Sequence, residues 1–170
     1  TGSVTVRPGG TLVHASRSMD LLSGFNELQA NLHVAGGDVS IANGAGSEPW
    51  QWRFAGPWQV SDSSRILAFD NTGQSSFAKS SIVIQDSVTL APNGSLEVVG
   101  DAKVHFLEAV LLDSESRLRV RSRIELANPI RLTNRARLEG DGEITGNVTV
   151  GNLGVLARGS LESSPGPLKL

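Results

Sequence analysis

The chain of 170 residues contains no cysteine and no tyrosine, and neither sign of charge is in large excess. Without cysteine it can form no disulfide, thiolate metal site or cysteine nucleophile. Its formal net charge of -2 argues against binding nucleic acid or an anionic membrane through overall charge. No apolar run approaches the roughly 20 residues that a membrane-spanning helix needs. We therefore expect no nucleic-acid partner and no membrane span in this chain.

Metal-ligand spacing is also lacking, because His14, His33 and His105 fall in different parts of the repeating pattern described below. The sequence has no GxSxG, no P-loop and no acid-rich calcium nonapeptide. We therefore expect no metal and no other cofactor.

Glycine is abundant, at 19 residues, and Val, Ile, Leu and Thr alternate with polar turn clusters over most of the chain. Helical signals are weak. The best candidate is residues 16–30, where Met19, Leu22, Phe25 and Leu28 have near-helical spacing but Gly24 interrupts it. A short helix or an irregular loop is expected there, and strands and turns elsewhere.

One pattern of apolar residues recurs along the chain. In residues 146–160 it consists of Val148, Val150 and Leu156, at offsets 0, +2 and +8. The same offsets give Val4, Val6 and Leu12; Trp58, Val60 and Ile66; Val88, Leu90 and Leu96; Val110, Leu112 and Leu118; and Ile130, Leu132 and Leu138. A further copy at Leu32 and Val34 ends on Val39 or Ile41. A turn-like segment such as "APNGS" separates the two apolar groups of each copy.

A further short strand precedes most copies, at offsets -6 and -4. It comprises Trp52 and Phe54, Ile82 and Ile84, Val104 and Phe106, and Ile124 and Leu126; in the last copy only Ile144 remains, at offset -4. Each unit therefore reads as three short strands joined by bends, followed by a connection of variable length. A solenoid tolerates such variation, because extra residues extend as loops while the strands stay stacked.

The sequence thus predicts a single all-β domain over residues 1–170, a parallel β-helix (β-solenoid) of about seven coils that belongs to a longer protein. The outward residues support this register. Glu97, Arg119 and Glu139 share offset +9, so stacked coils would alternate their charges. The alternative is a small antiparallel sandwich in which Pro-Gly-Gly or Asn-Gly forms hairpins.

The C-terminal 35 residues resemble the autotransporter-associated β-strand repeats of bacterial passenger domains. The matching positions are Leu138, Gly140, Gly142, Ile144, Gly146-Asn147-Val148, Leu156-Ala157 and Ser164-Pro165-Gly166. Two positions depart from the family pattern, at Ala157-Arg158-Gly159 and at Gly166-Pro167. The resemblance implies a right-handed parallel β-helix in a secreted or surface protein associated with the bacterial outer membrane. It implies no catalytic activity.

Two clusters are candidates for binding. Arg117, Arg119 and Arg121 lie on one face of an expected strand, and Arg131, Arg135 and Arg137 lie on the next coil. They could bind a sulfated glycan, a phosphate or an acidic partner. All three tryptophans fall between residues 50 and 58. The offsets place Trp52 and Trp58 inside and leave Trp50 as a candidate contact residue.

Our expectation for function is a structural or adhesive segment that presents loops near residues 15–30, 42–50 and 70–80 to a protein or glycan on a host or neighbouring cell. Self-association through the open ends of the stack is a further expectation. The alternative is a carbohydrate-active β-helix, a polysaccharide lyase, a hydrolase or a tailspike-like depolymerase. Its acid and base would come from Asp101, Lys103 and His105, with Glu125 and Glu143 beside His105.

Overall fold

Parallel strands are the regular elements of the described molecule. The structure, a computed structural model, describes residues 2–15, 25–42, 51–69 and 81–158. Every element within these ranges is a β-strand, and every strand pairing is parallel. The protein is therefore an all-β chain built on a large parallel sheet. The antiparallel sandwich is wrong, because its hairpins would require antiparallel neighbours.

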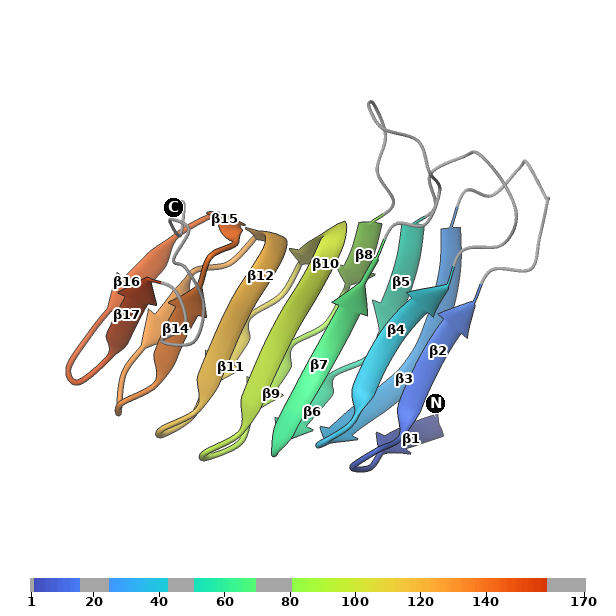
Figure 1. Ribbon diagram of the computed structural model, residues 1–170, viewed down its shortest axis with the longest axis horizontal. Helices are drawn as coiled ribbons and strands as arrows, with labels where there is room; N and C mark the ends of the chain where they lie inside the picture. The colour runs from blue at the N-terminus through green and yellow to red at the C-terminus, as the bar shows by residue number, and fades with distance from the viewer. Residues whose placement is uncertain (1, 16–24, 43–50, 70–80, 159–170) are drawn as a thin grey trace.

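The pairings divide the strands into three rows. The first row contains β1 (Gly2–Val6), the second half of β3 (Phe25–Ala35), β6 (Trp58–Ser61), β9 (Val88–Leu90) and β11 (Val110–Leu112). Next to β11 it continues with β13 (Ile130–Leu132), which pairs with β16 (Val148–Val150) in a two-stranded sheet. In Figure 1 the strands follow one another along the long axis of the molecule, from the blue N-terminal end to the red C-terminal end.

The second row contains β2 (Thr11–Ala15), β4 (Asp38–Ala42), β7 (Ser63–Ala68), the first halves of β10 (Ser95–Phe106) and β12 (Arg117–Leu126), β14 (Arg137–Gly140) and β17 (Val155–Arg158). The third row contains the first half of β3, β5 (Gln51–Ala55), β8 (Ser81–Ile84), the second halves of β10 and β12, and β15 (Glu143–Thr145). The long strands β3, β10 and β12 therefore each belong to two rows.

Inward side chains of neighbouring strands lie in register and form apolar columns. Two columns of the first row are Val4, Leu32, Trp58, Val88 and Val110, and Val6, Val34, Val60, Leu90 and Leu112. In the second row Leu96, Leu118, Leu138 and Leu156 share a column, as the repeat predicts. Most of these side chains are fully buried in one continuous core. Because alternate residues of a strand point to opposite faces, this burial follows from the period-two apolar pattern.

One part of the second row departs from the predicted register by two residues. Ile66 pairs with Val98, and Leu96 pairs with Ser64. The turn between Val60 and Ser64 is two residues shorter than the corresponding turn between Leu90 and Leu96. A shift of two preserves the inward-outward alternation, so Ile66 still faces the interior, although Ser64 is also buried there. Nearer the N-terminal end of the same row, Val39 pairs with both Leu12 and Ile66. Of the two residues considered for this position, Val39 and Ile41, the structure therefore has Val39.

The last coil also departs from the predicted offsets. Ile144 pairs with Ile124, so the next inward position after it is Gly146, which lies against Leu126. A side chain at Gly146 would begin 2.7 Å from the Leu126 Cβ atom. The connection from β15 to β16 is therefore two residues shorter than the corresponding connection from β12 to β13.

The helix considered for residues 16–30 is wrong over its second half. Residues 25–30 lie in strand β3 and pair with both β5 and β1. Leu28 packs against the core from this strand. Residues 16–24 lie outside the described part of the chain.

Candidate functional site: an arginine-rich groove

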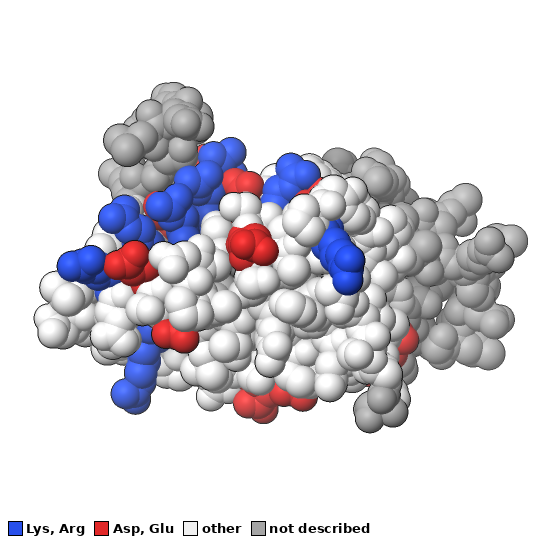
Figure 2. Space-filling view, turned by 90° about the horizontal axis from the view of Figure 1, so that it is seen from below, with Lys and Arg blue, Asp and Glu red and all other residues white. Residues whose placement is uncertain are grey.

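The second row brings four of the predicted binding residues together. Arg117, Arg119 and Arg121 alternate along β12, and Arg137 on β14 pairs directly with Arg117. Arg131 lies elsewhere, since it belongs to β13 in the first row and pairs with Thr149. In Figure 2 the Lys and Arg side chains gather along one side of the molecule, toward the end that carries the C-terminal strands. The predicted cluster is thus brought together without Arg131.

A column of alternating charge runs beside this cluster. The predicted order Glu97, Arg119, Glu139 is confirmed by the strand register. The Arg119 guanidinium donates to Glu139 Oε1 from Nη2 at 2.8 Å and from Nε at 3.0 Å, and its Nη1 lies 3.8 Å from Glu97 Oε1. Each strand thereby places a charge opposite its complement on the next strand.

The column extends two residues farther than the sequence pattern indicated. Arg65 pairs with Glu97, and Asp38 pairs with Arg65, with the Arg65 guanidinium donating to both carboxylate oxygens of Asp38 at 2.6 and 2.8 Å. These two residues were missed because the short turns before β4 and β7 change their offsets from the start of their units. A search of the sequence for the turn lengths that place opposite charges on neighbouring strands could have found them.

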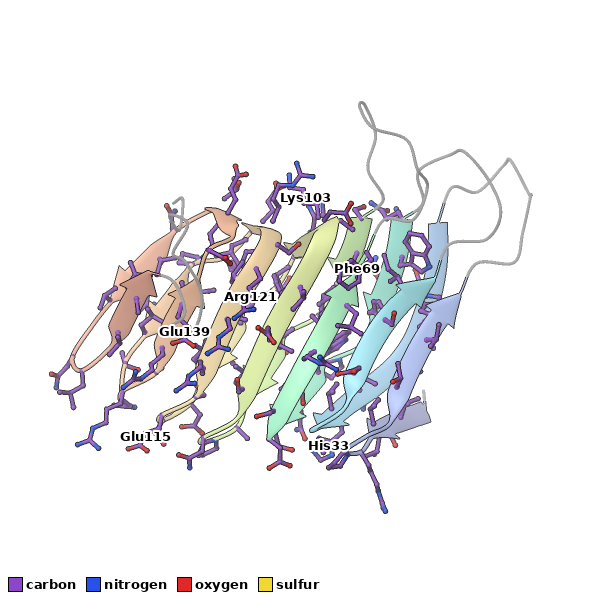
Figure 3. All side chains as sticks on the ribbon, viewed as in Figure 1. His33, Phe69, Lys103, Glu115, Arg121 and Glu139 are labelled. Carbon is purple, nitrogen blue, oxygen red and sulfur yellow. The ribbon has the colours of Figure 1, made fainter. Side chains whose placement is uncertain are left out.

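The acidic residues of this face lie beneath the basic ones. The Glu139 side chain is 10% exposed and the Glu97 side chain 22%, whereas the side chains of Arg117 and Arg121 are 43% and 36% exposed. Arg117 Nε lies 3.5 Å from Glu139 Oε1, and Arg121 Nε lies 3.1 Å from Glu97 Oε1. Figure 3 shows Arg121 and Glu139 over β12 and β14 on the face toward the viewer. The carboxylates therefore position the guanidinium groups, which make up more of the exposed surface.

A groove adjoins the arginines on the same face. The column that contains Arg117 and Arg137 continues in the other direction as Ser95 and Ser63, whose side chains are much shorter. A hollow of about 530 Å³ lies over this step, and a second hollow of about 270 Å³ shares Ser63, Ser95 and Arg117 with it. The first is also lined by Asn93, Glu115 and Arg135 of the turns, and the second by Arg65, Glu97 and Arg119 of the charge column.

The turns at one rim of the groove have a left-handed backbone. Asn93 and Glu115 have φ values of 60° and 58°, as the tight turns predicted between the strands require. The amide of Asn93 donates to the Ser114 carbonyl of the next turn, and the amide of Glu115 donates to the Asn134 carbonyl. Glu115 also forms an exposed ion pair with Arg135, at 3.1 Å. Stacked turns thus form a continuous rim, which Glu115 marks in Figure 3.

The cluster considered for acid-base chemistry lies at the opposite edge, where Figure 3 labels Lys103. Lys103 Nζ lies 2.5 Å from Glu125 Oε2, and His105 Nδ1 lies 3.3 Å from the same oxygen. Lys103 lowers the pKa of Glu125 by a hydrogen bond and by its charge. Partial burial lowers the pKa of His105, which outweighs the opposite effect of Glu125. The Glu125 carboxylate is therefore held ionised between a cation and a mostly neutral imidazole at pH 7.

Only part of that predicted cluster forms. Glu125 pairs with His105 as expected, but Glu143 pairs with Arg123 instead of lying beside Glu125. This difference arises because the connection from β15 to β16 is two residues shorter than the connection from β12 to β13, which changes the offset of Glu143 from the start of its unit. Among the residues that the structure describes, no group of three or more His, Asp or Glu side chains could hold a metal ion.

The tryptophan prediction is confirmed for two residues. Trp52 and Trp58 are 0% and 1% exposed, and Phe54 packs edge-on against Trp58 with ring centroids 5.1 Å apart. Trp50 lies outside the described residues, and so do most of the predicted contact segments 15–30, 42–50 and 70–80, of which residues 16–24, 43–50 and 70–80 are not described. Residues 25–30 of the first segment belong to strand β3 and do not form a loop. The structure therefore assigns the two described tryptophans to the core and gives them no surface for ligand contact.

No protein-family model, curated protein or solved structure matches this chain. The part of the chain that the structure describes also contains no helix with the length and apolar character needed to cross a membrane. The candidate site therefore rests on its own geometry, which consists of a serine-floored groove, a cluster of arginines and a column of paired charges.

Proposed function

We propose that this chain is a segment of a right-handed parallel β-helix that forms a stalk or passenger region of a secreted or surface-exposed bacterial protein. Its role would be structural and adhesive, with one outward face available to a partner. The observation that carries the proposal is the in-register parallel pairing of successive repeat units. The right hand is supported by the strong preference of parallel crossover connections for that hand.

The stacking supplies a physical reason for such a role. Each unit packs chiefly on the units before and after it, so the length of a solenoid can grow while its cross-section stays constant. The core side chains lie in columns along the same axis, and burying each large aliphatic side chain contributes roughly 1.5–3 kcal/mol. A chain of this kind makes a stiff support whose outward residues can vary without disturbing the interior.

The resemblance to autotransporter passenger repeats supports the location. It rests on the last 35 residues, of which the structure describes residues 136–158. Over that stretch Gly140 and Gly146 have φ values of 134° and 136°, which explains why the repeat has glycine at both positions.

The location can be tested on intact bacteria that produce the whole parent protein. We expect an antibody raised against residues 81–158 to label intact cells or the culture medium, and added protease to remove the cell-bound signal. A cytoplasmic protein serves as the control that must stay protected. Labelling that appears only after the cells are permeabilised would contradict the proposal.

The adhesive role can be tested by deleting the segment from the parent protein. We expect the deletion to reduce adhesion of the bacteria to a glycan-coated or cell-coated surface, and unchanged adhesion would contradict this role.

A further inference from the structure

We propose that the groove over Ser63, Ser95, Arg117 and Arg137 binds a linear anionic glycan, a polysaccharide that carries carboxylate or sulfate groups. The inference rests on the proposed function, because it names the partner class that an exposed adhesive face would meet. It follows from the charges of the groove, from the shape of its floor and from the groups that line it.

The first argument concerns two arginines in one column. Arg117 and Arg137 are register partners on adjacent strands, about 4.8 Å apart at the backbone, and like charges directly opposite each other are unfavourable. Arg117 is partly compensated by Glu139 at 3.5 Å. Within the described residues, no hydrogen bond or ion pair is found for the Arg137 side chain. A bound anion between the two would remove the repulsion.

The second argument concerns the balance of charge on the face. Six arginines stand on it or at its rim, against four carboxylates; the arginines are Arg65, Arg117, Arg119, Arg121, Arg135 and Arg137, and the carboxylates are Asp38, Glu97, Glu115 and Glu139. Two of the carboxylates lie beneath the arginines. A ligand that enters the groove therefore meets guanidinium groups, although the whole chain carries a formal charge of -2. Planar guanidinium groups bind carboxylate and sulfate oxygens in pairs.

The third argument concerns the floor. Ser63 and Ser95 are register partners, so their hydroxyls lie in line with the two arginines along the axis of the stack. Small hydroxyl groups leave room above them and can exchange hydrogen bonds with sugar hydroxyls. The two hollows share these serines and form one groove, between the turn rim and the charge column. A linear polymer can therefore lie along the stack with its acidic groups on the arginines.

Single-stranded nucleic acid is the competing polyanion. Proteins that bind it stack bases on aromatic side chains, and none of the residues that line the two hollows is aromatic. The groove instead offers two serine hydroxyls in line with two guanidinium groups, which suit a sugar chain that carries acidic groups. The glycan is therefore the ligand that this surface favours.

The test is a titration of the full chain with four probes: heparin, polygalacturonate, neutral dextran and a 30-nucleotide oligothymidylate. We expect at least one of the two acidic glycans to bind, and dextran and the oligonucleotide to bind at least tenfold more weakly. Raising the salt concentration should weaken the binding, since it screens the guanidinium charges. Absence of binding to both acidic glycans, or tighter binding of the oligonucleotide, would overturn the inference.

Variants separate the groove from bulk charge. The double variant Arg117→Gln/Arg137→Gln should weaken glycan binding at least tenfold. The matched double variant Arg7→Gln/Arg131→Gln removes the same charge outside the groove and should weaken it less than threefold. Equal losses in the two would mean that only overall charge attracts the glycan, and the groove would be rejected.

A second pair of variants keeps every arginine. Ser95→Glu places a carboxylate in register with Arg117, where it can form an ion pair and occupy the groove. It should abolish binding, whereas Ser95→Gln, of similar size and no charge, should retain most of it. Full binding by Ser95→Glu, at unchanged melting temperature, would overturn the inference. Failure of all glycan binding while antibody labelling of intact cells succeeds would remove this inference and leave the proposed function standing.

Discussion

Single charged residues on this fold differ widely in what they contribute, because their exposure differs. Arg119 bridges two carboxylates of which one, Glu139, is nearly buried, whereas Arg135 pairs with Glu115 in solvent. A buried acceptor that loses its donor costs the full desolvation penalty of the group, while exposed ion pairs contribute little. Two arginines that look alike in the sequence therefore differ in structural importance.

We predict that Arg119→Gln lowers the free energy of unfolding by about 1–3 kcal/mol, because Glu139 keeps only the longer contact to Arg117. Arg135→Gln is the matched control and should change it by less than about 0.5 kcal/mol. Urea denaturation of the two variants and the parent chain measures both values. Indistinguishable midpoints for the two variants would contradict this account of the charge column.

His105 gives the stability a dependence on pH. Partial burial lowers its pKa below the ordinary value of 6.5, so the unfolded chain binds a proton more readily than the folded one. The stability that depends on a neutral His105 is therefore fully present above the pKa of His105 in the unfolded chain. It declines as the pH falls from that pKa to the lower pKa of His105 in the folded chain. Glu125, whose pKa is also lowered, adds a loss at more acidic pH.

We predict that His105→Asn reduces the fall in melting temperature between pH 7.5 and pH 5.5, because the asparagine cannot take up a proton in that interval. The measurement is a series of thermal melts at constant ionic strength. Above pH 7.5 the slopes of the two proteins should coincide. A parent and a variant whose curves stay parallel down to pH 5.5 would show that His105 is not the group responsible.

At the scale of the element, the corners between the second and third rows restrict most strongly which residues the chain can have. Strand β10 passes this corner at residues 100–102, where its register with β12 shifts. Ser122 occupies the corner of β12, and its hydroxyl donates to the Ala102 carbonyl at 2.8 Å. Gly100 has a φ of 129°, and a side chain there would begin 2.1 Å from the Ala68 carbonyl oxygen. The corner thus requires glycine both for its backbone and for the close approach of the neighbouring strand β7.

We predict that Gly100→Ala destabilises the protein by about 2 kcal/mol or more, because it combines an unfavourable backbone conformation with a backbone clash. Gly2→Ala is the control, since a Cβ at Gly2 has no atom within 4 Å. Chemical denaturation again gives the comparison. A Gly100→Ala variant as stable as Gly2→Ala would mean that the corner can be remodelled freely.

The same corners and turns explain which parts of the fold the sequence could predict. Inward columns such as Val88, Val110 and their neighbours were predictable, because alternating apolar residues must point to one side. The pairing of Ile66 with Val98 was not, since a two-residue change in turn length leaves the apolar pattern unchanged. In the groove, the arginines were visible as a cluster. Ser63 and Ser95 were not, because small polar residues do not contribute to the periodic apolar pattern. Their place beside the arginines is known only once the strand register is known.

At the scale of the whole molecule, stability should vary along the stack. Strand β10 has parallel partners on both sides, β7 and β8 on one and β12 on the other. Strand β16 pairs only with β13 among the described strands, and its residue Val150 is 48% exposed. In the β-helix proposed above, stability would be approximately a sum over neighbouring units, so a unit with one neighbour would open more readily than a unit with two.

We predict that backbone amides of β10 and β12 exchange with deuterium most slowly, and that those of β16 and β17 exchange fastest among the described strands. Native-state hydrogen exchange read by mass spectrometry on peptides from each strand measures the order. Equal protection from β10 to β17 in the 170-residue chain would show that the molecule opens as one cooperative unit, and nearest-neighbour stacking would then not describe its stability.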